Sequence, residues 1–115
     1  MKKNAILKGK LVVSIEQAVA APYCSSKLVE AGARVIKVER KEGDFARYYD
    51  TFVKGQSTYF VWLNRGKESL IANLKKKEDI NLLIRILKKA DILIQNLLPG
   101  TFKKIGLDSS SLKKI

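Results

Sequence analysis

The stretch Gly32-Ala33-Arg34-Val35-Ile36-Lys37-Val38-Glu39-Arg40 decides the fold of this chain. Its first residue, a glycine, can take the left-handed conformation that ends a preceding helix. The β-branched residues at its centre predict a short strand that is covered on both faces. A charged loop, Gly43-Asp44-Phe45-Ala46-Arg47, follows the strand. Because ligands of open α/β sheets bind outside the carboxyl ends of the strands, we expect the functional site at this loop.

Apolar runs and helical periodicity alternate along the rest of the chain. Strands are expected at residues 11–15, 35–39, 69–74 and 91–95, and helices at 22–31, 78–90, 101–105 and from 108 onward. The helix at 78–90 has the clearest signal, with Ile80, Leu83, Ile84 and Leu87 at the spacing of one helical face. Residues 57–63 are compatible with either a strand or a short helix. The alternation predicts an α/β fold with a mostly parallel, Rossmann-like sheet and flanking helices.

The loops that follow parallel strands lie along one edge of the sheet. In this sequence those loops are residues 16–21, 40–47, 75–77 and 96–100. They would bring together small residues, two cationic clusters and an amide side chain. Such an edge suits a phosphorylated cofactor.

Length and apolar content exclude several classes of protein. The chain has 115 residues, 46% of them hydrophobic, which fits one domain with a core. No apolar run approaches the roughly 20 residues that span a bilayer. The basic start, residues 1–8, has no long apolar region after it, and the chain has one cysteine, Cys24. We therefore expect a cytoplasmic protein with no membrane partner.

The net charge of +12 is compatible with nucleic acid, an anionic membrane or a phosphorylated ligand. The lysines are scattered, and several stand where helices should end, so we interpret most of the excess as solvated surface. Aromatic residues and lysines do not alternate as in an RNA-binding sheet, so nucleic acid is not the expected partner. A nucleic-acid-binding module stays as an alternative from another class. The chain has no histidine, which limits acid–base chemistry to carboxylates, lysine, tyrosine or cysteine.

Three common ligand motifs are absent. Residues 16–21 contain no glycine, which argues against a dinucleotide fingerprint. No phosphate-binding loop of the G-x-x-x-x-G-K-[ST] type occurs, and no Cys/His cluster suits a metal. We expect no metal cofactor.

A set of motifs nevertheless occurs in a fixed order. The motifs are Ala20-Ala21-Pro22-Tyr23, Ala31-Gly32-Ala33-Arg34-Val35-Ile36-Lys37-Val38-Glu39-Arg40, Gly43-Asp44-Phe45-Ala46-Arg47, Asn64-Arg65-Gly66-Lys67-Glu68-Ser69-Leu70, Ala90-Asp91-Ile92-Leu93-Ile94-Gln95-Asn96-Leu97-Leu98-Pro99-Gly100 and Ile105-Gly106-Leu107. From about residue 9 to residue 115, this set closely resembles the N-terminal part of the class III CoA-transferase family. That group includes formyl-CoA transferase, carnitine CoA-transferase and α-methylacyl-CoA racemase.

The resemblance implies that residues 1–115 form the coenzyme A-binding, Rossmann-like N-terminal domain of a larger CoA-transferase fold. Family members move CoA between an acyl-CoA and a carboxylic acid, and they form interlocked homodimers. In that family an aspartate attacks the acyl-CoA and carries anhydride and thioester intermediates, which is covalent catalysis by a carboxylate.

The resemblance also assigns CoA-binding positions. They are Val19, Ala20, Arg40, Ala72, Asn73, Leu74, Lys75, Asn96, Leu97, Leu98 and Lys104. In this assignment Val19 and Ala20 let the backbone approach CoA, Arg40 meets the nucleotide, and Lys75 meets a phosphate. The segment that begins at Asn96 flanks the adenine. Lys104 stands where an arginine is frequent, which keeps the charge and loses the bidentate fork.

No catalytic residue is assigned within the chain. The family's catalytic aspartate lies beyond Ile115, so it corresponds to none of Asp44, Asp50, Asp91 and Asp108. We expect a fragment of a longer enzyme or a truncated gene product, without transferase turnover by itself. A 2-methylacyl-CoA racemase of the same fold and a non-catalytic fragment stay as alternatives to the transferase.

Several of these residues also have purely structural interpretations. Arg40 and Lys75 can be solvated surface charges, and Asn96 can be a turn residue. Glu39 is expected to pair with a neighbouring cation, and Asp44 with Arg47. Two further expectations concern packing: Cys24 as a small buried residue, and Tyr48, Tyr49 and Trp62 as packing or dimer contacts.

Overall fold

The computed structural model describes residues 5–115, so the first half of the basic start, residues 1–4, lies outside the described residues. The elements are β1 (Leu11–Ile15), α1 (Ala20–Glu30), β2 (Arg34–Glu39), the 3₁₀ turn η1 (Phe45–Tyr48), α2 (Thr58–Asn64), β3 (Glu68–Ile71), α3 (Lys77–Leu87), β4 (Ile92–Gln95), α4 (Thr101–Lys104) and α5 (Ser109–Leu112). They alternate as the sequence pattern predicts.

The four strands form one parallel sheet in the order β3-β2-β1-β4. β1 lies at the centre, where Val13 is level with Ile36 of β2 and with Leu93 of β4. The parallel arrangement confirms that the loops after all four strands lie at one edge.

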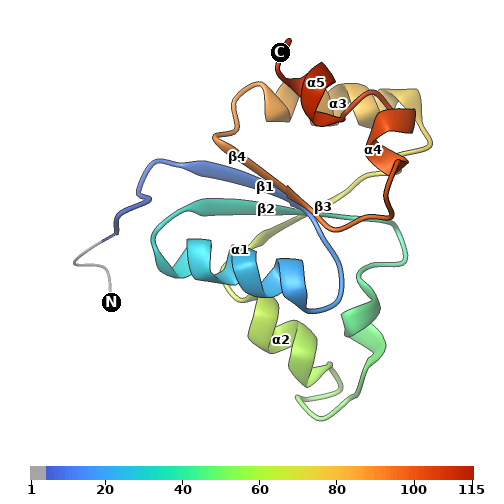
Figure 1. The fold of residues 1–115 in the computed structure, drawn as a ribbon. Coiled ribbons are helices and arrows are strands. Elements are labelled where there is room, and N and C mark those ends of the chain that lie inside the picture. The colour runs from blue at the N-terminus through green and yellow to red at the C-terminus, as the bar shows by residue number, and fades with distance from the viewer. Residues whose placement is uncertain (1–4) are drawn as a thin grey trace.

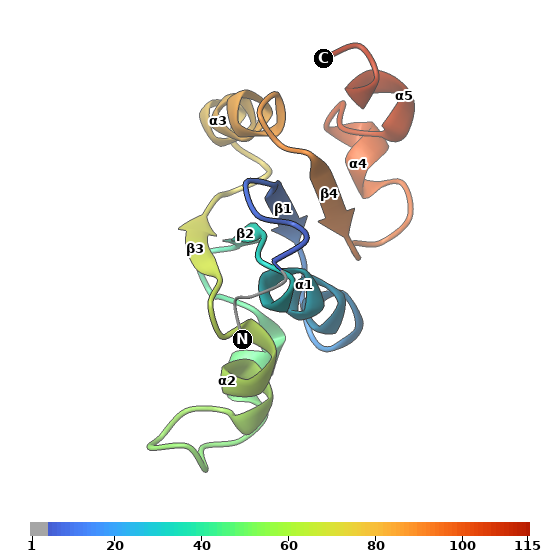
Figure 2. The same ribbon diagram turned by 90° about the vertical axis from the view of Figure 1, so that its left-hand side faces the viewer.

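Helices cover both faces of the sheet. α3, α4 and α5 lie on one face, α1 lies on the other, and α2 packs beside α1 (Figure 1). The view along the sheet shows the same two sides (Figure 2). The larger core lies under α3 and α4 and contains Val13, Ile15, Val38, Ala72, Leu83, Leu87, Phe102 and Leu107. A smaller core of Val12, Ala33 and Val35 lies under α1.

α1 ends at Gly32, as the sequence predicts. Gly32 has a φ of 101°, and its N–H donates to the carbonyl of Val29 at 2.9 Å. The next N–H, of Ala33, donates to the carbonyl of Leu28 at 3.0 Å. This pair of bonds satisfies carbonyls at the helix end and needs a left-handed residue between them.

Gly32→Ala is expected to destabilise the fold by more than about 1–2 kcal/mol, the cost of a left-handed residue with a side chain. An added Cβ would lie 2.7 Å from the Cβ of Ala5, so steric repulsion adds to the backbone cost. Gly55→Ala is the matched control, because Gly55 has a φ of +86° and no neighbour within 4 Å of an added Cβ. Urea denaturation of both variants measures the difference. Equal losses would show that the contact with Ala5 contributes nothing.

The structure settles one open point and corrects two details of the sequence interpretation. Of the two alternatives for residues 57–63, the helix is right: α2 covers Thr58–Asn64, and the Ser57 side chain caps it by accepting a hydrogen bond from the Phe60 N–H. β3 ends at Ile71 rather than at residue 74, because the chain then turns through a bond from the Lys76 N–H to the Asn73 carbonyl. Cys24 is exposed on α1, so the expectation of a buried cysteine is wrong. Among residues 5–115, no helix is long and apolar enough to cross a membrane.

Candidate functional site

A cavity of about 660 Å³ lies at the carboxyl ends of the strands. Residues that follow each of the four strands contribute to its wall. The predicted CoA-binding positions that line it are Arg40, Ala72, Asn73, Leu74, Lys75 and Leu97. The cavity therefore lies at the expected edge of the sheet, and the predicted positions after β2 and β3 all line it.

The other predicted positions lie outside this wall. Val19 and Ala20 are exposed where the first loop enters α1. Leu98 is 81% exposed, and Lys104 is exposed on α4. In the part of the chain that the structure describes, neither Leu98 nor Lys104 lines the cavity.

Asn96 reaches the cavity wall indirectly. Its Oδ1 accepts from the Gln17 N–H at 3.0 Å, and its Nδ2 donates to the Gln17 carbonyl at 2.8 Å. Gln17 itself lines the cavity. The amide side chain after β4 therefore holds the loop after β1, which is a structural role of the kind expected for a turn residue.

Charged side chains of both signs line the cavity, including the carboxylates of Glu42 and Asp79. Arg40, Lys41, Lys75 and Lys76 all line it, and within residues 5–115 none of them lies within 4.0 Å of a carboxylate oxygen. The Arg40 guanidinium lies 4.3 Å from the centre of the Phe45 ring, and its Nε donates to the Gly43 carbonyl at 3.2 Å. These contacts orient Arg40 while leaving its charge uncompensated, which suits an anionic ligand.

Glu39 holds the charged loop against the end of β2. Its carboxylate is buried and pairs with Arg47, with an Nη2–Oε1 distance of 2.7 Å and an Nε–Oε2 distance of 2.8 Å. It also accepts from the Asp44 N–H at 2.9 Å and from the Ser69 hydroxyl at 3.1 Å. The expected pairing of Glu39 with a neighbouring cation is confirmed.

The expected pair between Asp44 and Arg47 is wrong. Arg47 pairs with Glu39, and the Asp44 carboxylate instead lies 2.7 Å from Nζ of Lys37. Asp44 turns inward because its Oδ1 accepts from the Ala46 N–H at 2.9 Å, which caps η1. Its side chain is therefore buried beneath the loop and does not lie on the loop surface.

Four buried charged residues, Glu16, Lys37, Asp44 and Lys67, form what we call the buried ion-pair cluster. Nζ of Lys37 lies 3.1 Å from Oε2 of Glu16, and Nζ of Lys67 lies 2.6 Å from the same oxygen. All four side chains are at most 2% exposed. The cluster carries two positive and two negative charges, so it is neutral as a whole. Every buried side-chain nitrogen and oxygen in residues 5–115 has a hydrogen-bond partner.

Hydroxyl groups and a carbonyl complete the cluster. Oε1 of Glu16 accepts from the hydroxyls of Ser14 and Ser25, and Lys67 also donates to the Pro22 carbonyl at 3.0 Å. Sequence reasoning missed this cluster. Its signal was Lys37 itself, a charged residue between Ile36 and Val38 in a strand that is covered on both faces.

The surroundings lower the pKa of two buried carboxyl groups, Glu16 of the cluster and Glu39 outside it. Burial alone would raise the pKa of Glu16, but the charge of Lys37 and the hydrogen bonds from Lys67, Ser14 and Ser25 outweigh it, so the pKa lies below its ordinary value. Burial likewise would raise the pKa of Glu39, and the bonds from Arg47 and the Asp44 N–H outweigh it. Both groups therefore stay ionised in the folded protein at pH values where they are protonated in the unfolded chain.

Stability is expected to fall as the pH drops below about 4.5, the ordinary pKa of both groups. The unfolded chain then binds protons that the folded chain does not, so the free energy of unfolding decreases until the folded carboxyls also protonate. Urea denaturation at a series of pH values between 7 and 3 measures this loss. Glu39→Gln is expected to show a shallower dependence, and an unchanged slope would contradict the assignment to Glu39.

The four aspartates considered above are engaged in structural bonds. Asp44 belongs to the buried ion-pair cluster, and Asp50 accepts from the Thr58 N–H at 2.9 Å. Asp91 accepts from the Leu11 N–H at 2.8 Å, and Asp108 accepts from two serine hydroxyls of α5. These contacts support leaving all four without a catalytic assignment. Within residues 5–115, no group of His, Cys, Asp and Glu side chains could hold a metal ion.

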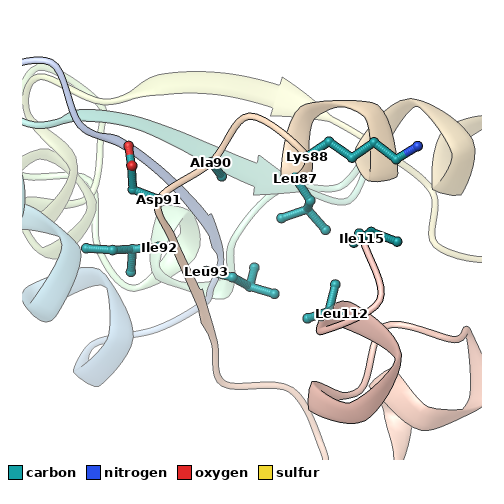
Figure 3. Close-up of a pocket in the computed structure, with 8 residues that line it drawn as sticks. All are labelled: Leu87, Lys88, Ala90, Asp91, Ile92, Leu93, Leu112 and Ile115. Carbon is teal, nitrogen blue, oxygen red and sulfur yellow. The ribbon is translucent and has the colours of Figure 1, made fainter.

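A second cavity, of about 270 Å³, lies at the start of β4 between the end of α3 and α5. The aliphatic side chains of Leu87, Leu93, Leu112 and Ile115 gather around it (Figure 3). The carboxylate of Asp91 in its wall is already bonded to the Leu11 N–H. This hollow offers no set of converging polar groups, so the cation-lined cavity is the candidate site.

The fold and the candidate site together define a Rossmann-like α/β domain of the kind that binds ligands at the carboxyl ends of its strands. Comparison with known families identifies a match to CoA-transferase family III over residues 7–115. The chain therefore belongs to CoA-transferase family III.

Characterised relatives agree with this membership. The chain is 38% identical over 115 residues to an acetyl-CoA:oxalate CoA-transferase of Acetobacter aceti, a match that covers 99% of this chain and 30% of that protein. It is 32% identical over 111 residues to a succinyl-CoA:glutarate CoA-transferase of Mus musculus, covering 95% of this chain and 26% of that protein. The chain thus spans less than a third of the length of these curated relatives.

Solved structures show the same fold. A CAIB/BAIF family protein from Brucella suis superposes with a TM-score of 0.88 at 37% identity, covering 97% of this chain and 31% of that one. The D175A mutant of Rv3272 from Mycobacterium tuberculosis superposes with a TM-score of 0.86 at 34% identity, covering 93% of this chain and 29% of that one.

Proposed function

We propose that residues 1–115 form the coenzyme A-binding N-terminal part of a CoA-transferase that moves CoA between an acyl-CoA and a carboxylic acid. The observation that carries this proposal is the cavity at the carboxyl ends of the strands, where four cationic side chains without an ion pair within residues 5–115 outnumber two such carboxylates, Glu42 and Asp79. Coenzyme A carries a phosphorylated adenosine diphosphate, so its nucleotide end presents several negative charges. A cation-lined cavity at this edge of a parallel sheet suits that end of the molecule.

The predicted positions have distinct roles in this proposal. Arg40, after β2, and Lys75, after the adjacent β3, bind phosphate oxygens, and Ala72 and Leu74 offer apolar surface to the adenosine. Asn73 lies between these two residues, and its side chain accepts from the Lys75 N–H at 2.9 Å, which fixes the start of the lysine run. Leu97 closes the cavity from the β4 side.

The names of the relatives favour a transferase over a racemase. The relatives from Acetobacter aceti and Mus musculus are both CoA-transferases, and their named acids, oxalate and glutarate, are small dicarboxylic acids. We therefore propose acyl-CoA and a carboxylic acid as the substrates of the complete protein. We also propose that the complete protein is a homodimer, with the exposed aromatic side chains Tyr48, Tyr49 and Trp62 among its contacts.

The proposed ligand is expected to bind through its phosphates. Isothermal titration with coenzyme A should give saturable binding that weakens as salt increases, because salt screens the phosphate contacts. 3′-Dephospho-coenzyme A should bind more weakly, and pantetheine, which lacks the nucleotide, should show no measurable binding. Binding of pantetheine as tight as that of coenzyme A, or no binding of coenzyme A at low salt, would contradict the proposal.

A further inference from the structure

We propose that the buried ion-pair cluster positions the loop after β1 for coenzyme A, with Asp44 and Lys37 as its positioning residues. This inference rests on the proposed function, because the loop carries the predicted CoA-binding positions Val19 and Ala20. Lys37 and Lys67 do not line the cavity, whereas Glu16 and Asp44 do, so the cluster reaches from behind the site to its wall.

The loop after β1 contains a residue in an unfavourable conformation. Ala18 has a φ of 67°, a left-handed value that residues with a side chain rarely adopt. Its N–H donates to Oδ1 of Asp44 at 2.8 Å, across 26 positions of sequence. A conformation of this kind persists only where surrounding contacts hold it. Within residues 5–115, the bond to Asp44 is the one hydrogen bond that a side chain makes to Ala18.

The same carboxylate oxygen also holds the loop after β2, the strand next to β1. Oδ1 of Asp44 accepts from the Ala46 N–H at 2.9 Å and so caps η1. Glu16 and Gln17 of the first loop line one part of the cavity, and residues 40–44 line another. One oxygen atom therefore ties together two separate segments of the wall and sets their spacing.

Lys37 holds this carboxylate in place. Its Nζ lies 2.7 Å from Oδ2 of Asp44 and 3.1 Å from Oε2 of Glu16. These contacts fix the position of the Asp44 side chain, and so fix the N–H groups of Ala18 and Ala46 from which its Oδ1 accepts. Lys37 projects from the centre of β2, a rigid element, which fixes the position of the whole arrangement.

Two variants of Asp44 separate positioning from charge. Asp44→Asn and Asp44→Ala both remove the negative charge, but asparagine keeps an oxygen that accepts from the Ala18 N–H. Coenzyme A affinity, measured by isothermal titration, is expected to fall at least tenfold in Asp44→Ala and to stay within about threefold of wild type in Asp44→Asn. Equal affinity losses in the two variants would overturn the proposal.

A variant of Lys37 separates positioning from direct ligand contact. Lys37→Met keeps the length of the side chain and removes the ammonium, at a position that does not line the cavity. Coenzyme A affinity should fall about tenfold, whereas Lys27→Met, the same change at an exposed position of α1, should leave it unchanged. Wild-type affinity in Lys37→Met would overturn the proposal. Circular dichroism of each variant checks that it is folded. If Asp44→Ala does not fold, the affinity of Lys37→Met decides alone: a tenfold loss supports the proposal, and wild-type affinity overturns it.

A readout without ligand distinguishes failure of this inference from failure of the proposed function. Hydrogen exchange of the Ala18 amide, followed by NMR, should be at least tenfold faster in Asp44→Ala than in wild type and nearly unchanged in Asp44→Asn. If wild type does not bind coenzyme A, the proposed function fails, and the exchange rates still test the positioning role. Equal Ala18 exchange in wild type and Asp44→Ala would overturn that role whether or not coenzyme A binds.

Discussion

Glu16→Ala is expected to lower the melting temperature by more than about 10 °C. Removing one partner of a buried ion pair costs about 3–5 kcal/mol, because the other charge stays buried without compensation. For a domain of this size, about 1 kcal/mol shifts the melting temperature by several degrees. Glu16 is the centre of the cluster, since its Oε2 contacts both Lys37 and Lys67.

The loss arises from the groups that Glu16 leaves behind. In Glu16→Ala the Lys67 ammonium keeps two oxygen acceptors, the Pro22 carbonyl and the Asn64 side chain, and loses its carboxylate. Lys37 keeps Asp44, so the cluster as a whole carries one uncompensated positive charge. Burial already lowers the pKa of Lys67, with Glu16 acting against that shift. Without Glu16, the cost of keeping Lys67 charged in the folded protein is therefore expected to increase.

Glu30→Ala is the matched control for this prediction. Glu30 also pairs with a lysine, Lys27 at 3.3 Å, but both side chains are more than half exposed. Exposed pairs of this kind contribute little to stability, so the melting temperature should not change measurably. Differential scanning calorimetry of wild type and both variants gives the comparison. Similar small shifts in Glu16→Ala and Glu30→Ala would show that the buried ion-pair cluster does not hold the fold together.

The general fold was predictable because its signals are local. The runs at Leu11–Ile15 and Arg34–Glu39, the spacing within α3 and the glycine at position 32 each depend on a few neighbouring residues. Parallel pairing then follows from the alternation of strands with helices. The edge of the sheet that carries the candidate cavity could be named for the same reason.

The buried ion-pair cluster was not predictable from patterns of this kind. Its members stand at positions 16, 37, 44 and 67, and which charge meets which depends on how the loops fold back over the sheet. A charged loop such as Gly43–Arg47 indicates that an ion pair is possible. Asp44 nevertheless pairs with Lys37 and not with Arg47, which is nearer in the sequence. Which side chains of a helix face solvent is equally hard to predict. Cys24 is an example, because it was expected to be buried and is exposed on α1.

The double charge reversal Arg40→Glu/Lys75→Glu is expected to reduce coenzyme A affinity more than 100-fold. A hydrogen bond to a charged group contributes about 1.5–3 kcal/mol, so losing two such contacts removes about 3 kcal/mol or more. Each factor of ten in affinity corresponds to about 1.4 kcal/mol, and the introduced carboxylates also repel the phosphates. Arg40 is exposed and Lys75 lies in a loop, so the double variant should fold like wild type.

Lys88→Glu/Lys89→Glu is the matched control, because it changes the net charge by the same amount at the far end of α3. Both lysines are exposed and follow Leu87, away from the carboxyl ends of the strands. If phosphate contacts at the cavity hold the ligand, this control should lose only the small affinity that comes from the overall charge, and that loss should vanish at high salt. Isothermal titration at two salt concentrations measures both variants. Equal losses in the two double variants would mean that coenzyme A responds to the net charge of the domain, and the assignment of Arg40 and Lys75 to the phosphates would then be wrong.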